Sequence, residues 1–129
     1  MKALVDTNAY TALMGGEEKI TSILEASDEV FVPTTVLGEL HGGFQMGKFR
    51  DRNNRELELF LSKPGVRVVD ITKAVAERYG VLIKILKKQG TPIPTNDIWI
   101  SAAVLETGSK LLTRDRHFKH VPGIYILPF

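Results

Sequence analysis

The feature that most constrains the fold is the alternation of short apolar runs with longer helical patterns. The apolar runs span residues 3–5, 30–32, 66–71, 111–113 and 125–127, and the helical patterns span residues 7–14, 17–26, 35–46, 51–61, 73–88 and 96–107. Short runs of this kind are typical of strands buried on both faces of a sheet. Strands that alternate with helices predict an α/β fold, in which a parallel sheet of about five strands is sandwiched between helices.

The composition favours one domain that spans residues 1–129. With 43% hydrophobic residues and no cysteine, the chain is long enough to bury a core without disulfides. The glycine and proline breakers lie between the expected elements, and no shift in composition marks a second domain. No apolar run approaches the ~20 residues of a membrane span, and the amino terminus does not read as a signal peptide. We therefore expect a cytoplasmic protein without membrane contact.

Four acidic residues stand beside or inside apolar runs, where an unpaired carboxylate is difficult to accommodate. They are Asp6, Glu39, Asp97 and Asp115. Ionised carboxylates are rarely buried unless they pair with a cation or bind a metal. Asp6 and Asp115 each follow a predicted strand, so both are expected at the carboxyl edge of the sheet, where ligands bind in open α/β folds. If the fold brings all four acids together, it builds a cation site.

Asp97 and Glu39 are expected to reach this edge from helices. Asp97 opens the last helical pattern, with Thr95 or Asn96 as the predicted N-cap, and the amino end of a helix supports negative charge. Glu39 lies at the border of an apolar helical stripe and is expected to be half-buried. Each aspartate alone is also explained as an ordinary helix cap. The joint pattern favours a site, because four converging carboxylates repel one another strongly unless a cation is present.

Oxygen ligands select a hard cation, so the predicted cofactor is Mg²⁺, with Mn²⁺ as a substitute. Asp6 and Asp97 are the predicted direct ligands. Glu39 and Asp115 would hold coordinated waters or complete a second metal site. A metal lowers the pKa of water, so that an unpaired carboxylate can take its proton and the water can attack a phosphorus atom in line.

Several other polar residues are candidates for supporting roles. Asn8 and Thr113 are expected to orient the carboxylates through hydrogen bonds. His117 is interpreted as an exposed histidine in a basic turn. A basic surface around an acidic pocket attracts polyanions, although the arginines near residue 50 can equally be balanced by acids on the same helix. The candidate substrate contacts are Arg50, Arg52, Arg114 and Arg116.

The order and spacing of these motifs resemble the PIN-domain ribonucleases. The resemblance rests on Asp6-Thr7-Asn8 after the first strand, Glu39 in an early helix, Asn96-Asp97-Ile98-Trp99-Ile100 at the start of a later helix, and the segment from Leu112 to Phe118 after a strand. It covers essentially the whole chain and is closest to the VapC toxins of prokaryotic toxin–antitoxin pairs. It implies that the four acids are the catalytic quartet of that family and that Thr113 is its strand-end hydroxyl.

The resemblance implies a Mg²⁺-dependent endoribonuclease that acts as a toxin and hydrolyses RNA phosphodiester bonds with a metal-activated water. It also implies a small antitoxin that blocks the acidic pocket with a basic residue, and the apolar helices favour a homodimer. Two alternatives stay open at this point. One is a receiver-like phosphoacceptor domain, although Asp6 has no acidic neighbour. The other is a catalytically silent RNA-binding or scaffold module of the same fold.

Overall fold

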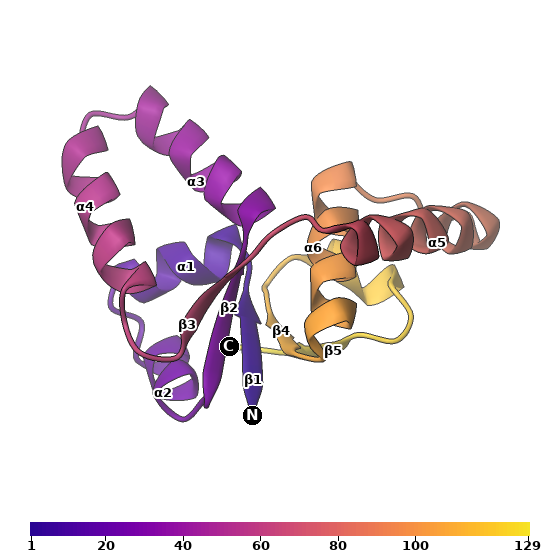
Figure 1. Ribbon diagram of the computed structural model, residues 1–129, viewed down its shortest axis with the longest axis horizontal. Helices are drawn as coiled ribbons and strands as arrows, with labels where there is room; N and C mark the ends of the chain where they lie inside the picture. The colour runs from indigo at the N-terminus through magenta and orange to yellow at the C-terminus, as the bar shows by residue number, and fades with distance from the viewer.

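A parallel sheet of five strands forms the centre of the computed structural model, which describes residues 1–129 (Figure 1). The strands are β1 (Lys2–Val5), β2 (Glu29–Pro33), β3 (Val66–Val69), β4 (Lys110–Leu112) and β5 (Tyr125–Leu127). They lie in the order β3-β2-β1-β4-β5, and each pair of neighbours is parallel. The predicted parallel sheet is confirmed.

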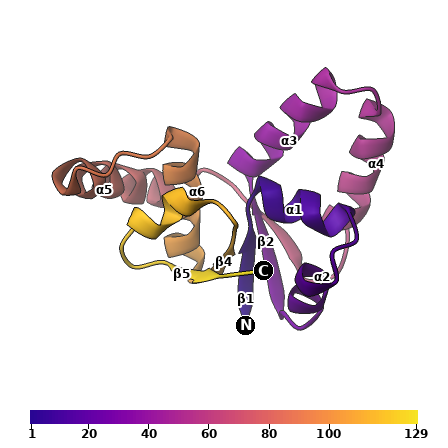
Figure 2. The same cartoon turned by 180° about the vertical axis from the view of Figure 1, so that it is seen from behind.

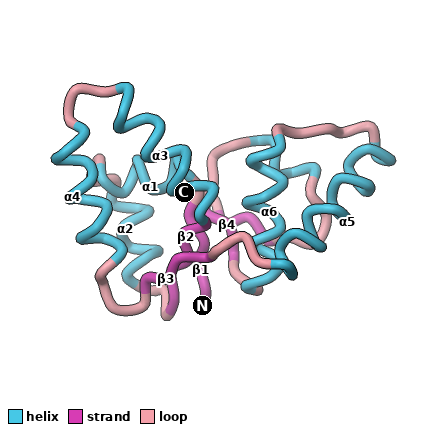
Figure 3. Tube along the Cα trace, turned by 45° about the horizontal axis from the view of Figure 1, so that its top comes forward, coloured by secondary structure: helices cyan, strands magenta, loops and turns pink.

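Helices cover both faces of this sheet. They are α1 (Thr7–Met14), α2 (Glu18–Glu25), α3 (Thr34–Met46), α4 (Arg50–Leu61), α5 (Lys73–Gln89) and α6 (Thr95–Thr107), with a short 3₁₀ helix, η1 (Arg116–His120). The first four lie on one side of the strands and α5 and α6 on the other, as both cartoon views show (Figures 1 and 2). The tube view shows the strands between the two groups (Figure 3). The expected sandwich is therefore present.

The strand order fixes where a site can form. From β1 the chain builds outward through β2 to β3, and it then returns through α5 and α6 to place β4 on the other side of β1. The order therefore reverses between β1 and β4, and α/β folds bind ligands at the carboxyl ends of the strands that flank such a reversal. In receiver domains β3, not β4, lies beside β1. The receiver alternative is wrong for this chain.

The core explains why the strands hold their positions. Ala3, Leu4 and Val5 in β1 have no exposed surface, and Leu111 and Leu112 in β4 are equally buried. Parallel strands that are covered on both faces bury apolar side chains on both, which accounts for the unbroken apolar runs in the sequence. A second, smaller cluster joins α5 to α6. None of the helices is both long and apolar enough to cross a membrane.

Two elements differ from the sequence prediction. The strand predicted for residues 66–71 ends at Val69, because the Thr72 hydroxyl accepts a hydrogen bond from the Val75 N–H and starts α5. Ile71 is consequently 49% exposed rather than part of the sheet. The 3₁₀ helix η1 was not predicted at all, since a single helical turn is too short to show a hydrophobic period.

Candidate active site

The carboxyl ends of β1 and β4 bring Asp6 and Thr113 together. Val5 lies opposite Leu112 in the sheet, so the residue that follows each strand is adjacent in space. The Thr113 hydroxyl donates a hydrogen bond to Oδ2 of Asp6, and the Ala9 N–H donates one to Oδ1 at 2.8 Å. Asp6 thereby caps α1 while it is only 4% exposed. The hydroxyl that was expected to orient a carboxylate does so.

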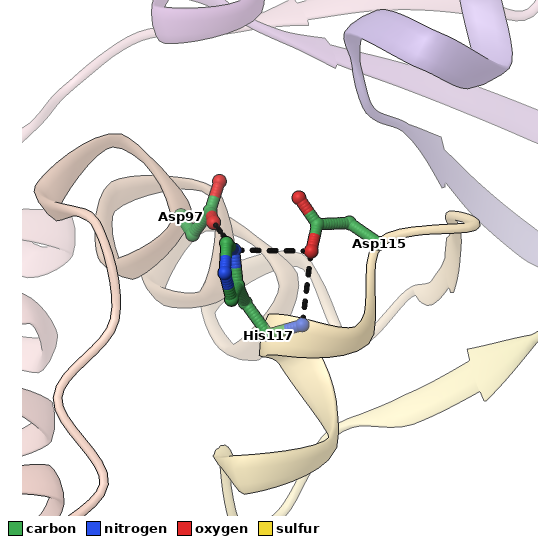
Figure 4. Close-up of side chains that lie close together, drawn as sticks. All are labelled: Asp97, Asp115 and His117. Atoms are coloured by element: carbon green, nitrogen blue, oxygen red, sulfur yellow. Dashed lines mark hydrogen bonds and ion pairs between the residues drawn. The ribbon is translucent and has the colours of Figure 1, made fainter.

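Asp97 and Asp115 face each other across His117. Nδ1 of His117 lies 3.0 Å from Oδ2 of Asp97 and 3.0 Å from Oδ1 of Asp115. Figure 4 shows the imidazole ring reaching from the start of η1 toward both carboxylates. Asp115 caps η1 through the N–H of His117, at 2.9 Å, and its own N–H donates to the Thr113 hydroxyl at 2.9 Å. Thr113 therefore connects Asp6 to the backbone of Asp115.

The helix that carries Asp97 begins one residue earlier than its sequence suggests. The N-cap of α6 is Pro94, so the prediction of Thr95 or Asn96 as the cap is wrong. Asp97 lies in the first turn, where the positive end of the helix dipole stabilises a carboxylate. The Ser101 hydroxyl donates to the Asp97 carbonyl at 2.7 Å. Asp97 is thus held by the helix rather than used to cap it.

Glu39 lies in the second turn of α3 and is exposed, not half-buried as expected. α3 leads away from the sheet (Figure 1), and Glu39 lies on a solvent-exposed part of it. The Thr7 hydroxyl at the start of α1 donates to Oε1 of Glu39 at 3.0 Å. This contact joins α1 to α3 beside Asp6.

The electrostatics of the site connect all four acids. Burial raises the pKa of the Asp6 carboxyl, the hydrogen bonds from Thr113 and Ala9 lower it, and the charges of Asp115 and Asp97 raise it further. The pKa of Asp97 is raised in the same way by burial, lowered by the hydrogen bond with His117, and raised by Asp115 and by Glu39. The three aspartates therefore act on one another, and Glu39 is near enough for its charge to act on Asp97.

The donor set fits a divalent cation. Asp97, Asp115 and His117 each offer one ligand atom, and these atoms lie within 4.8 Å of one another. Carboxylate oxygens select Mg²⁺ or Mn²⁺. Asp6, one of the two predicted direct ligands, lies outside this group of three, although the charges of Asp115 and Asp97 act on it. Asp6 and Asp97 are the two whose pKa values the cluster perturbs.

The other predicted site residues lie outside this cluster. Asn8 is exposed, and no hydrogen bond joins its side chain to a carboxylate, so the predicted orienting role is not seen for Asn8. The Arg114 guanidinium pairs with both carboxylate oxygens of Glu17 and lies 4.2 Å above the ring of Phe129. Arg116 is exposed and adjoins His117.

Arg50 and Arg52 stand at the start of α4, away from the acids. Nε of Arg50 lies 3.3 Å from Oδ1 of Asp51, and Nε of Arg52 lies 4.0 Å from Oε1 of Glu56. The acidic neighbours considered from the sequence are thus in place. Both arginine side chains remain more than half exposed, at 55% and 58%. Their predicted contact with the substrate stays a prediction.

Sequence reasoning missed two residues of this site. Thr7 was quoted only as part of a motif, yet it fixes Glu39. His117 was interpreted as an exposed histidine, and it is exposed, but its contacts with Asp115 and with Asp97, 20 positions away along the chain, were not predicted. The spacing of Asp115 and His117 was the one signal in the sequence for this contact. A capping aspartate accepts a hydrogen bond from the N–H two positions later, which brings the two residues together.

Comparisons with known proteins agree with this geometry. The PIN domain model matches residues 3–124. Ribonuclease VapC1 of Haemophilus influenzae strain R2866 is 29% identical over 126 residues, which cover 94% of this chain and 92% of that protein. Ribonuclease VapC2 of Rickettsia felis is 26% identical over 105 residues, 81% of this chain and 77% of that protein.

Solved structures show the same fold. The crystal structure of DNA-bound VapBC from Salmonella typhimurium superposes with a TM-score of 0.88 at 25% identity, over 99% of this chain and 98% of that one. This chain therefore belongs to the PIN-domain family, and its predicted similarity to the VapC proteins within that family is confirmed.

Proposed function

We propose that this protein is a Mg²⁺-dependent endoribonuclease and the toxin of a toxin–antitoxin pair. The observation that carries the proposal is the convergence of Asp6, Glu39, Asp97 and Asp115 at the carboxyl edge of the sheet, where each raises the pKa of another or has its own pKa raised. Membership of the PIN family and similarity to proteins named Ribonuclease VapC support the same activity.

In this proposal Asp6 and Asp97 hold the metal, with Mn²⁺ as a substitute for Mg²⁺. When bound, the metal supplies Lewis acidity that activates a water and stabilises charge on the phosphate. Thr113 keeps the Asp6 carboxylate fixed in one orientation, because its hydroxyl and the Ala9 N–H occupy one oxygen each. Asp115 and Glu39 provide carboxylates that can accept a proton from the attacking water.

The chemistry predicts which ends the products carry. When water attacks phosphorus, the new bond is between the water oxygen and phosphorus, and the bond to the 3′ oxygen breaks. The products are then a 5′-phosphate and a 3′-hydroxyl, and the RNA 2′-hydroxyl takes no part. A 2′,3′-cyclic phosphate among the products of the purified protein would contradict this mechanism.

The test is to incubate the purified protein with mixed cellular RNAs and Mg²⁺ or Mn²⁺, and to map cut sites and end groups. Asp6→Asn, Glu39→Gln, Asp97→Asn and Asp115→Asn should each abolish cleavage while circular dichroism shows a folded domain. Chelation should stop cleavage and added Mg²⁺ should restore it. Two or more of these variants cutting like the parent would show that the acids are not the site.

The remaining alternative is a catalytically silent RNA-binding or scaffold module. The arrangement of the acidic residues argues against it. A module that only binds RNA has no need to keep four mutually repelling carboxylates together, since their repulsion destabilises the fold. All four acids are present in this chain, the three aspartates act on one another, and the charge of Glu39 acts on Asp97.

The proposed antitoxin is a small protein encoded beside this one, with a segment that blocks the acidic cluster. An arginine suits that task, because a guanidinium is always charged and can bind carboxylates in a bidentate manner. Expression of this chain alone should slow growth, and co-expression of the adjacent small protein should relieve it. If the protein cleaves RNA but its expression is harmless, and no partner co-purifies with it from its native cell, the nuclease function stands and the toxin assignment is wrong.

We also propose a homodimer that uses α5. This helix packs mainly on α6, and it exposes Val81 at 60% and, on a different side of the helix, Ile83 at 37%. A hollow of about 380 Å³ lies beside Val81, between α5 and α6. Val81→Glu should shift the parent from dimer to monomer in analytical ultracentrifugation. A parent that is already monomeric at micromolar concentration would remove the dimer.

A further inference from the structure

The turn between α3 and α4 carries a group of residues that neither the core nor the acidic cluster uses. This group, the basic tip, consists of Lys48, Phe49, Arg50 and Arg52. All four are exposed, and Phe49 is 56% exposed although it is a large apolar side chain. None of them belongs to either hydrophobic cluster. Their side chains are therefore available to a partner in solution.

The charge of this segment favours a polyanion. Residues 46–55 contain four basic side chains and one acidic one, Asp51. Nε of Arg50 lies 3.3 Å from Asp51, and Nε of Arg52 lies 4.0 Å from Glu56. Both are exposed, loose ion pairs, which contribute little to stability. Either arginine can therefore exchange its carboxylate partner for a phosphate. Lys48 makes no ion pair.

The shape adds a second feature. A hollow of about 420 Å³ lies at the tip and is lined by residues 45 and 47–52. The Arg52 guanidinium lies 4.4 Å from the centre of the Phe49 ring, so a flat cation covers an exposed aromatic face. Aromatic and guanidinium planes are the surfaces on which unpaired bases stack, whatever their sequence. Phosphate-binding cations and a base-stacking pair together fit single-stranded RNA better than they fit an acidic peptide.

The position of the tip relates it to the acidic cluster. α3 begins where β2 ends, carries Glu39 in its second turn, and leads away from the sheet to the tip (Figure 1). The seven residues from Glu39 to Met46 advance about 10 Å along the helix. A strand cut at the acids therefore has to extend well past the cut to reach the tip. The tip is separate from the reacting centre, and α3, which carries Glu39, connects the two.

We propose that the basic tip is a distal RNA-binding site, which holds a single-stranded segment beyond the cut by its phosphates and one stacked base. The proposal rests on the ribonuclease function proposed above. It assigns Lys48, Arg50 and Arg52 to phosphates and Phe49 to a base. The acids perform the chemistry, and the tip determines how tightly a long substrate is held.

The test measures binding separately from cleavage. In an Asp6→Asn background, fluorescence anisotropy gives the affinity for a labelled single-stranded RNA across a salt series. Adding Lys48→Ala, Arg50→Ala and Arg52→Ala should weaken binding at least tenfold at low salt. Because each phosphate contact with a single strand contributes about 0.7 to the slope of log K against log salt, the slope should fall by about 2. The matched control, Lys84→Ala, Lys87→Ala and Lys88→Ala on α5, removes the same charge elsewhere and should leave the slope unchanged.

The stacking role has its own variants. Phe49→Ala should weaken binding about fivefold or more, whereas Phe49→Tyr, which keeps the ring, should bind like the parent. Equal affinity and equal salt slope for the tip variants and the parent would overturn the inference. Tip variants that bind RNA normally but no longer bind an acidic segment of the antitoxin would also overturn the inference. If the parent cuts RNA and the tip variants bind RNA normally, only the proposal of a distal site is wrong. If the parent neither binds nor cuts any RNA, both the proposed function and the distal site are wrong.

Discussion

The Thr113 hydroxyl donates a hydrogen bond to Oδ2 of Asp6, and this contact joins the carboxyl ends of β4 and β1. It lies at the one place where the strand order of the sheet reverses. Asp6 is 4% exposed there, and it shares the site with two other aspartates whose charges act on it. The fold therefore holds a carboxylate in a position that is unfavourable without a positive charge.

The raised pKa of Asp6 has a consequence for the pH dependence of stability in metal-free solution. Between the ordinary pKa of 3.8 and the raised one, the native state binds a proton that the unfolded state has released. The stability contributed by this group is therefore complete below pH 3.8 and is lost as pH rises through the raised pKa. Asp97 acts in the same direction.

Asp6→Asn should consequently be more stable than the parent in chelator at neutral pH. A gain of about 1 kcal/mol would raise Tm by roughly 3–6 °C for a domain of this size. The measurement is urea denaturation of both proteins from pH 4 to 8 with EDTA, and the difference between the two curves should grow with pH. A difference that does not change with pH would show that Asp6 titrates normally.

Thr113→Val removes the hydroxyl but keeps the shape of the side chain, so it tests the hydrogen bonds of Thr113. The substitution leaves a buried carboxylate oxygen of Asp6 and the Asp115 N–H without their partner, which costs about 1–3 kcal/mol of stability. Cleavage should fall with it, because both carboxylates lose their orientation. Thr113→Ser keeps the hydroxyl and should retain most of the activity. Equal activity in Val and Ser variants would mean that the hydrogen bond does not position the site.

The sheet could be predicted from the sequence because its strands are buried on both faces. Ala3, Leu4 and Val5 have no polar face, so the run in the sequence matches the strand in the structure. β3 is at the edge of the sheet, where Arg67 and Val68 are exposed, and the end of this strand was misplaced by two residues. Burial provided the signal in the first case, and its absence explains the error in the second.

The site could be predicted only in part, because its parts are joined by contacts between distant residues. Asp6 and Asp115 were predicted at this edge from their places after strands, which topology alone determines. The exposure of Glu39 depends on how far α3 extends past the sheet, and no local pattern encodes that distance. The pairing of Arg114 with Glu17 joins residues 97 positions apart, and no local pattern predicts a contact over that separation.

Added Mg²⁺ should stabilise the parent. A ligand that binds only the native state at 100 times its Kd adds about 2.7 kcal/mol. Asp6→Asn and Asp97→Asn should lose most of this gain in thermal scans with and without Mg²⁺. Thr7→Ala, which releases Glu39 but removes no carboxylate, should keep most of it. Mg²⁺ should also reduce the fall in stability with rising pH, since metal binding favours deprotonated ligands. Equal gains in the parent and in both aspartate variants would place the metal elsewhere.

The Arg114 pair can be tested against the substrate role predicted from the sequence. The guanidinium binds both oxygens of Glu17, which precedes α2, and its Nε lies 3.4 Å from the carbonyl of Phe129. These contacts fix the backbone between Thr113 and Asp115. If that is its role, Arg114→Ala and Glu17→Ala should lower kcat by similar factors, and the double variant should be no worse than either single variant.

A phosphate contact would behave in the opposite way in the same experiment. Arg114→Ala would then weaken RNA binding and lower the salt slope by about 0.7, whereas Glu17→Ala would free the arginine and strengthen binding. We expect an unchanged salt slope for both variants, and partial rescue of kcat by Arg114→Lys, which keeps the charge but not the bidentate geometry. Opposite effects of the two single variants on RNA affinity would restore Arg114 to the substrate surface, whereas matched losses of kcat would make it a positioning residue for Asp115.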